Sequence, residues 1–155
     1  MNLSERTHPV LAIAPQAGGS ALAGDYISMK GTGHVTVAVM IAQGHATPPA
    51  LTLYQATAVA GTGAKALAKD VKIWAVADAA TSDSMVAQTD GVAFTPDAAL
   101  KNKIVLFEVP VDALDMDNDF TCIQVRAGAS NDLNIVSAVY WCSEERYHGS
   151  SKIVD

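Results

Sequence analysis

Hydrophobic and polar residues alternate in several short runs along the chain, and the clearest run spans residues 34–43. Within this run, β-branched residues occupy every second position from Val35 to Ile41, and His, Thr, Ala and Met alternate with them. A period of two places one set of side chains on one face of a strand and the other set on the opposite face. The run therefore predicts a half-buried strand.

A second strand is predicted at residues 50–56, directly after the loop at residues 44–49. Pro48 and Pro49 lie in this loop, where they block helix formation and cannot donate hydrogen bonds to a strand ladder. We therefore expect the two strands to be antiparallel and joined by a stiff connection.

Further strands are predicted where short apolar or alternating runs are bounded by turn-forming residues. They lie at residues 9–14, 26–30, 71–76, 85–94, 104–109, 121–126 and 135–142. The turn 89–91 predicts a hairpin within residues 85–94, because its glycine tolerates a tight turn. Residues 127–132 are interpreted as the hairpin loop between the last two strands. The run 104–109 is apolar on both faces except at Glu108, which predicts a strand in the middle of a sheet.

Helical periodicity is almost absent, and a single helical turn is predicted at residues 111–115, with Leu114 under the sheet. About eight short strands at fairly regular spacing favour an all-β fold, a single-domain β-sandwich or jelly roll, over an α/β enzyme fold. We expect one domain over residues 1–155 and a polar tail at residues 143–155. Residues 1–15 are interpreted as an extended arm that adds a strand to a neighbouring subunit, or equally as an ordinary disordered terminus.

Charge and composition exclude some classes of partner. Ten basic residues against sixteen acidic residues give a net charge of −6, which disfavours nucleic-acid binding because phosphate contacts need clustered Lys and Arg. The N-terminus has no basic region followed by an apolar run, and the apolar runs are too short to span a bilayer. We therefore expect synthesis in a cytoplasm and no membrane partner.

The two cysteines are too few for a disulfide scaffold and lack zinc-ligand spacing. If Ile123 faces the core, Cys122 faces outward, and if Trp141 faces the core, Cys142 faces outward as well. The two thiols would then be neighbours on one face of adjacent strands. A disulfide is still not the favoured expectation, because it needs a specific geometry and cytosolic assembly keeps thiols reduced.

One acidic loop is a candidate metal site, since Asp115, Asp117 and Asp119 have the spacing that begins a calcium loop. The match ends there, because Phe120 replaces the turn glycine and Arg126 stands where the bidentate glutamate belongs. A solvated acidic turn is the favoured interpretation, with a loose cation site as the alternative.

No other motif indicates catalysis or a cofactor. The glycine-rich stretch at residues 61–65 lacks the spacing of a P-loop, and it is interpreted as a plain turn. The four histidines are scattered, and no serine has a G-x-S-x-G context. We therefore expect no catalytic residue and no cofactor.

Three stretches, in order along the chain, resemble a family of small tailed-bacteriophage virion proteins. Residues 51–67 resemble the family's leucine-glutamine-alanine strand and its Gly-Thr-Gly-Ala-Lys turn, and residues 108–126 resemble a later acidic turn that leads into a strand ending in Val-Arg. Residues 145–147 are similar to the Arg-Tyr that closes the last strand. The chain departs from the pattern at Pro110, where the family continues its strand, and at residues 117–119, where the family's turn is richer in glycine.

The resemblance implies a virion structural protein encoded near the major capsid protein. Its implied role is that of a decoration or cement protein on the capsid exterior, which binds the major capsid protein and bridges its subunits as a homo-oligomer, with a trimer favoured. The candidate partner-binding residues are Pro9, Val10, Leu11, Ile13, Pro48 and Pro49.

Three alternatives to capsid decoration remain at this stage. The first is a tail or head-to-tail connector component. The second is a carbohydrate- or host-surface-binding jelly roll, which would predict exposed aromatic residues beside the acidic loop at residues 115–119 and a calcium requirement. The third is a small enzyme with an unrecognised site.

Overall fold

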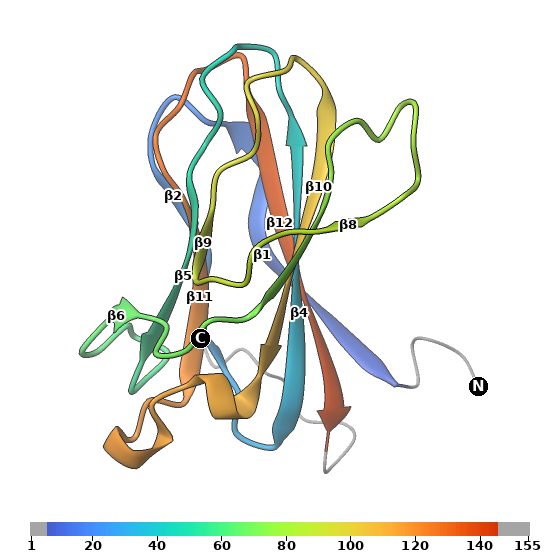
Figure 1. The fold of residues 1–155 in the computed structure, drawn as a ribbon. Helices are drawn as coiled ribbons and strands as arrows, with labels where there is room; N and C mark the ends of the chain where they lie inside the picture. The colour runs from blue at the N-terminus through green and yellow to red at the C-terminus, as the bar shows by residue number, and fades with distance from the viewer. Residues whose placement is uncertain (1–5, 146–155) are drawn as a thin grey trace.

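The computed structural model describes residues 6–145, whose strands form two antiparallel sheets, A and B, packed against each other (Figure 1). Sheet A has the order β1 (Thr7–Ala17), β12 (Ile135–Glu145), β4 (Thr32–Ala42), β10 (Asn102–Pro110), β7 (Lys72–Val76) and β8 (Val86–Ala87). Sheet B has the order β2 (Leu22–Ala23), β11 (Cys122–Ala127), β5 (Leu51–Ala56) and β6 (Lys65–Ala66), with β3 (Ile27–Ser28) paired to β11 and β9 (Ala93–Phe94) paired to β5.

The predicted all-β class is confirmed, but the expected strand count of about eight is too low. The described residues contain twelve strands, five of which are only two residues long. Such strands, for example β6 and β8, are too short to produce a recognisable period of two in the sequence. The strand order establishes two antiparallel sheets, and it does not by itself establish a jelly roll.

The core lies between the sheets and follows the predicted alternation in β4, where Val35, Val37 and Val39 are fully buried. Tyr140 of β12 is the largest fully buried side chain, and it joins the two sheets. Its hydroxyl accepts a hydrogen bond from the backbone N–H of Val125 at 2.9 Å and donates one to the carbonyl of Asp25 at 3.0 Å. Burial raises the pKa of Tyr140, so the hydroxyl keeps its proton and remains a donor.

The expectation that residues 34–43 and 50–56 are paired neighbours is wrong. β4 pairs with β10 and β12 in sheet A, whereas β5 lies in sheet B, so the stiff loop between them crosses from one sheet to the other. Asn134 holds this loop, because its side-chain amide donates to the carbonyl of Thr47 at 2.7 Å and its Oδ1 accepts the N–H of His45 at 2.8 Å.

Both predicted hairpins are wrong for the same reason. β8 pairs with β7 in sheet A, while β9 pairs with β5 in sheet B. Likewise, β11 belongs to sheet B and β12 to sheet A. Each turn signal marks a real change of direction, but the chain moves to the opposite sheet instead of returning beside itself.

Two other local predictions are confirmed. β10 lies in the middle of sheet A, between β4 and β7. The predicted helical turn is the 3-10 helix η2 (Val111–Ala113), and Leu114 after it is buried. A second 3-10 helix, η3 (Met116–Asn118), follows at once and forms the acidic loop.

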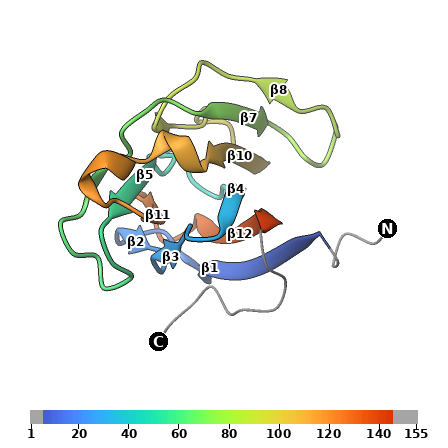
Figure 2. The ribbon, with the colours of Figure 1, turned by 90° about the horizontal axis from the view of Figure 1, so that it is seen from below.

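The N-terminal segment is not an arm over its described length. Residues 7–15 belong to β1, an eleven-residue strand that pairs with β12 of the same chain and forms one edge of sheet A (Figure 2). Residues 1–5 lie outside the described part of the chain. At the other end, residues 143–145 complete β12 instead of beginning a tail, and residues 146–155 also lie outside the description.

Candidate functional site

The most distinctive surface is the side of sheet A that faces away from sheet B. Figure 2 shows the strands of sheet A next to one another in the order β8 to β1. The strands of sheet B lie along one side of this row, and the opposite side is the outer side of sheet A. The strand register places the alternate residues of five strands on this outer side, and its apolar members form what we call the apolar face. We define the apolar face by nine of these residues, which are Leu11, Ala38, Met40, Trp74, Ile104, Leu106, Ile135, Val139 and Trp141.

The apolar face is open to solvent at several points. Leu11 is 55% exposed and Met40 is 43% exposed, and the more central residues are half-buried by their neighbours on the sheet. A shallow hollow of about 290 Å³ lies at one end of the apolar face. It is lined by Met40, Ile104, Ile135 and Ser137 of the sheet and by Ala79 of the loop after β7. Extended apolar surfaces with such hollows are typical of protein–protein contacts.

The other end of the same side of sheet A carries a compact polar cluster. His34 Nε2 lies 2.6 Å from Glu108 Oε2, and the Thr36 hydroxyl donates to the same oxygen at 2.7 Å. The hydrogen bond to Glu108 raises the pKa of His34, and the carboxylate of Glu144 adds to this effect. In turn, the hydrogen bond from His34 lowers the pKa of Glu108. The cluster therefore holds an ion pair when the imidazole is protonated.

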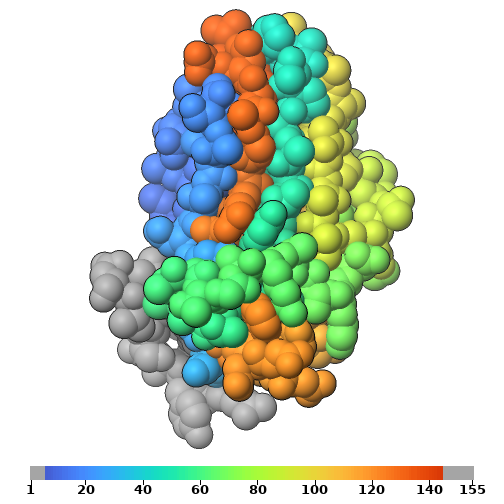
Figure 3. All heavy atoms as spheres, turned by 90° about the vertical axis from the view of Figure 1, so that its left-hand side faces the viewer, coloured from blue at the N-terminus to red at the C-terminus, as the bar shows by residue number. Residues whose placement is uncertain are grey.

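The outer side of sheet B is covered by its own side chains. The guanidinium of Arg126 lies 3.7 Å from the ring centroid of Tyr54 and donates to the Tyr26 hydroxyl at 3.2 Å. A small second cluster of buried residues, including Tyr26 and Cys122, lies on this side. Figure 3 shows the segment around β6 crossing the lower part of the same surface. Little apolar area is left for a partner there.

The acidic loop is tied to the β6 turn by an ion pair. Lys65 Nζ lies 2.6 Å from Asp115 Oδ2, and the side-chain amide of Asn118 donates to Asp115 Oδ1 at 2.8 Å. Asp117 and Asp119 are exposed beside them. Lys65 also sits over the ring of Phe120, 4.1 Å from its centroid, and Phe120 is only 9% exposed. The aromatic residue expected of a carbohydrate-binding loop is thus covered by a lysine.

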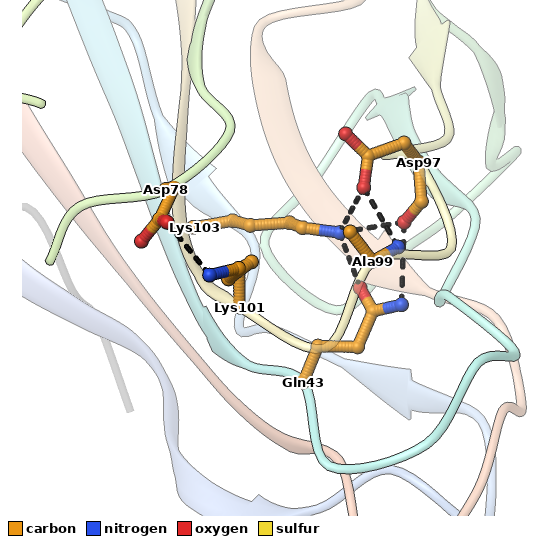
Figure 4. A network of polar contacts seen from close by, with 6 residues as sticks. All are labelled: Gln43, Asp78, Asp97, Ala99, Lys101 and Lys103. Carbon is orange, nitrogen blue, oxygen red and sulfur yellow. Dashed lines mark hydrogen bonds and ion pairs between the residues drawn. The ribbon is translucent and has the colours of Figure 1, made fainter. Parts of the chain in front are cut away.

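A buried lysine closes one end of a cleft beside β7 and β8. Lys103 is 2% exposed, and its ammonium donates to Gln43 Oε1 at 2.9 Å, to the carbonyl of Asp97 at 2.6 Å and to Asp97 Oδ1 at 2.7 Å (Figure 4). The cleft has a volume of about 420 Å³, and Phe94 and Val105 contribute to its mainly apolar wall. All three N–H donors of Lys103 are engaged, so this amine is a structural group and not a free nucleophile or anion ligand.

The candidate partner-binding residues divide into two groups. Pro9 and Leu11 point outward from β1, and Leu11 belongs to the apolar face. Val10 and Ile13 face the core, at 5% and 2% exposure, so their side chains are not available to a partner. The loop prolines Pro48 and Pro49 are half-buried and buried, respectively.

The expected arrangement of the two cysteines is also wrong. Neither cysteine forms a disulfide and both are buried, Cys122 on β11 of sheet B and Cys142 on β12 of sheet A. In β12 the residues facing the core are Val136, Ala138, Tyr140 and Cys142, which is the opposite face from the one expected. The thiols are therefore not neighbours on one sheet.

Neither a cluster of metal ligands nor a membrane-spanning helix is present in the described residues 6–145. No three or more His, Cys, Asp or Glu side chains come together there in a way that could hold a metal ion, the residues Asp115, Asp117 and Asp119 included. In the same part of the chain, no helix has the length and apolar character needed to cross a membrane.

Among solved structures, the fold is similar to the crystal structure of SPBc2 prophage-derived protein YomS. The TM-score is 0.51, and the match covers 88% of this chain and 93% of that chain. The two sequences are 9% identical, so the likeness concerns the fold alone. No protein-family model matches the sequence, and no curated protein matches it significantly.

The apolar face is the functional feature that the sequence interpretation missed. The signal was present, because residues 104–109 and 135–142 are apolar at both parities. We interpreted the first run only as a sign of a central strand. In the second run, the same double apolarity led to the wrong choice of core face.

Proposed function

We propose that this protein is a structural component of a tailed-phage particle, and specifically a decoration protein on the capsid exterior that binds the major capsid protein and bridges its subunits. In this proposal it has no catalytic role and no cofactor. The observation that carries the proposal is the apolar face, because a broad apolar sheet surface suits protein–protein contacts of the kind from which a particle is assembled.

Two further observations support a phage particle as the setting. The fold is similar to that of a prophage-derived protein. In addition, two of the stretches that resemble phage virion proteins lie together in space, because β11 pairs along the whole of β5 and Lys65 contacts Asp115. The likeness in sequence thus concerns one continuous structural region instead of scattered segments.

Cosedimentation tests the proposal directly. The purified full chain is mixed with heads of the phage that encodes it, assembled without this protein, and the bound fraction is measured against concentration. We expect saturable binding at a fixed ratio to the major capsid protein and slower loss of the shell on heating. Tails of the same phage serve as the matched control.

The outcomes separate the candidate roles. Binding to heads with no binding to tails supports decoration. Binding to tails or to the head-to-tail junction alone contradicts decoration and supports a connector component. Binding to neither contradicts a virion role for the isolated chain, and a glycan-array screen with and without Ca²⁺ would then test the host-surface alternative.

A further inference from the structure

We propose that two copies of this chain associate through the apolar face, with a two-fold axis that packs the face of one copy on the same face of the other. The inference goes beyond the proposed function and does not depend on it, because it concerns the purified chain alone. It also replaces the sequence-based expectation of a trimer.

The size of the apolar face fits a stable contact. Five strands of sheet A, up to eleven residues long, contribute side chains to it. At the usual rise per residue and strand spacing, the whole outer side of sheet A, its polar end at His34 and Glu108 included, measures about 30 Å by about 24 Å. A standard-size interface covers about 800 Å² on each partner, which is roughly the same area.

The edges of sheet A are less suited to pairing than its face. β1 is a long edge strand, but it carries Pro9 and Pro15 and has two irregularities in its register with β12. Proline and bulges are the usual devices that prevent an edge strand from accepting another strand. The opposite edge, β8, is only two residues long. The flat face is therefore the surface on which another copy can pack.

The charge distribution restricts which surfaces of two copies can meet. Each copy carries a net charge of −6, so most orientations of two copies bring acidic surfaces together. The apolar face contains no charged residue. At its margin Glu108 pairs with His34 and Lys72 with Asp90, and the carboxylate of Glu144 also acts on His34. Two copies therefore avoid opposing like charges when these neutral faces meet.

A two-fold axis follows from the use of one surface. An isologous contact needs the same patch on both copies, while a ring or trimer needs two different complementary patches. The apolar face supplies one patch that combines projecting side chains, such as Leu11, with the hollow lined by Met40 and Ile104. Face-to-face packing of sheets is also the arrangement already used inside this fold.

Light scattering after size exclusion, on the full chain over a dilution series, tests the inference. We expect the wild type to be a dimer at micromolar concentration, within the range seen for interfaces of this size. Met40→Glu places like charges in the contact and should raise the dimer dissociation constant at least about 100-fold. Met116→Glu is the matched control, since Met116 is 46% exposed on η3, away from the face, and it should change the constant less than about 3-fold.

A second variant keeps the test decisive if Met40→Glu does not fold, as judged by circular dichroism. Leu11→Glu lies on the same face at a more exposed position of an edge strand, and it should dissociate the dimer as well. A wild type that is monomeric over the whole series would overturn the inference. So would a trimer, or a dimer that both face variants leave intact.

The head-binding experiment and the light-scattering experiment can each give a negative result without the other. A dimer that does not bind phage heads refutes decoration and leaves the two-fold contact standing. Head binding by a chain that is always monomeric refutes the contact and makes the apolar face available to the capsid. If both hold, the dimer presents each of its other surfaces twice, which is the geometry that bridging two capsid subunits requires.

Discussion

The outer sides of the two sheets differ in whether their apolar side chains are covered by other residues of the same chain. On sheet B, Arg126 covers Tyr54 and Lys65 covers Phe120, so aromatic surface is closed by cations from the same chain. On sheet A, Trp74, Met40 and Leu11 have no such cover and remain exposed. Sheet B thus completes its own surface within one chain, whereas sheet A has a surface suited to a second protein.

This difference predicts where substitutions act. Changes on the sheet B side should lower the stability of the single chain, because its polar cover is intramolecular. Changes on the apolar face should weaken association and leave the single chain almost as stable as before. A polar group that is buried between the sheets belongs to neither outer side. Removing its partner should cause the largest loss of stability.

The largest loss of stability is expected for Asp97→Ala. It removes the charged partner of Lys103, which is 2% exposed and is left with Gln43 Oε1 and the backbone carbonyl of residue 97 as acceptors. We expect the free energy of unfolding to fall by about 2–3 kcal/mol, the usual cost of leaving a buried charge with fewer hydrogen bonds. Urea unfolding followed by circular dichroism measures it.

Asp78→Ala is the matched control for Asp97→Ala. Asp78 pairs with Lys101 at 3.1 Å near the same site, but Lys101 is half exposed (Figure 4). Ion pairs with an exposed lysine contribute little, so this variant should lose clearly less stability than Asp97→Ala, although it also loses the hydrogen bond that Asp78 accepts from the N–H of Ala80 at 3.1 Å. Equal losses in the two variants would show that burial of Lys103 is not what makes its contact important.

A smaller loss is expected for Arg126→Ala on the sheet B side. The variant loses the contact with the Tyr54 ring and the hydrogen bond to the Tyr26 hydroxyl, which together are worth about 1–2 kcal/mol. Arg126→Lys keeps the charge but not the planar, forked donor, and it should recover less than half of the loss. Full recovery by lysine would mean that charge alone, and not stacking, closes this surface.

Leu11→Ala supplies the comparison on the apolar face. Leu11 is 55% exposed, so its truncation should cost the single chain less than about 0.5 kcal/mol. Measured below the dimer's dissociation constant, its urea unfolding curve should nearly overlay that of the wild type. A loss as large as that of Arg126→Ala would remove the distinction between the two sides.

The same contrast between the outer sides explains why the core-facing side chains could be predicted for one strand of sheet A and not for another. β4 was predicted correctly because one parity holds only Val and Ile, while the other contains His34 and Thr36. In residues 135–142 both parities are apolar, and the greater bulk of the set with Trp141 predicts that this set faces the core. The core in fact holds the set with Ala138, because the side that would normally be polar is the apolar face.

The pairing of strands was beyond the reach of local patterns. Turn residues around Gly91 and Pro49 indicate that the chain reverses, but they do not say whether the next strand joins the same sheet. The deciding contacts are distant in sequence, such as Asn134 with Thr47 and Tyr140 with Asp25. For the same reason, Lys103 gave no signal, since its partners Gln43 and Asp97 meet it only in the folded chain.

The last prediction concerns pH and the ion pair at the margin of the apolar face. The pKa of His34 is raised in the folded chain, so its contribution is complete below the ordinary value of 6.5 and is lost as pH rises through the raised pKa. The pKa of Glu108 is lowered, so its contribution is complete above 4.5 and is lost as pH falls through the lowered pKa. The pair therefore stabilises the fold most between pH 4.5 and 6.5.

His34→Gln measures that contribution, because glutamine can still donate to Glu108 but carries no charge. The difference in unfolding free energy between wild type and variant should reach roughly 0.5–1 kcal/mol within this pH range, since the pair is only partly buried. It should shrink on both sides of the range, when His34 loses its proton or Glu108 gains one. A difference that stays constant from about pH 2.5 to about pH 8.5, roughly two units beyond each ordinary pKa, would mean that packing of the imidazole, and not its charge, stabilises this end of sheet A.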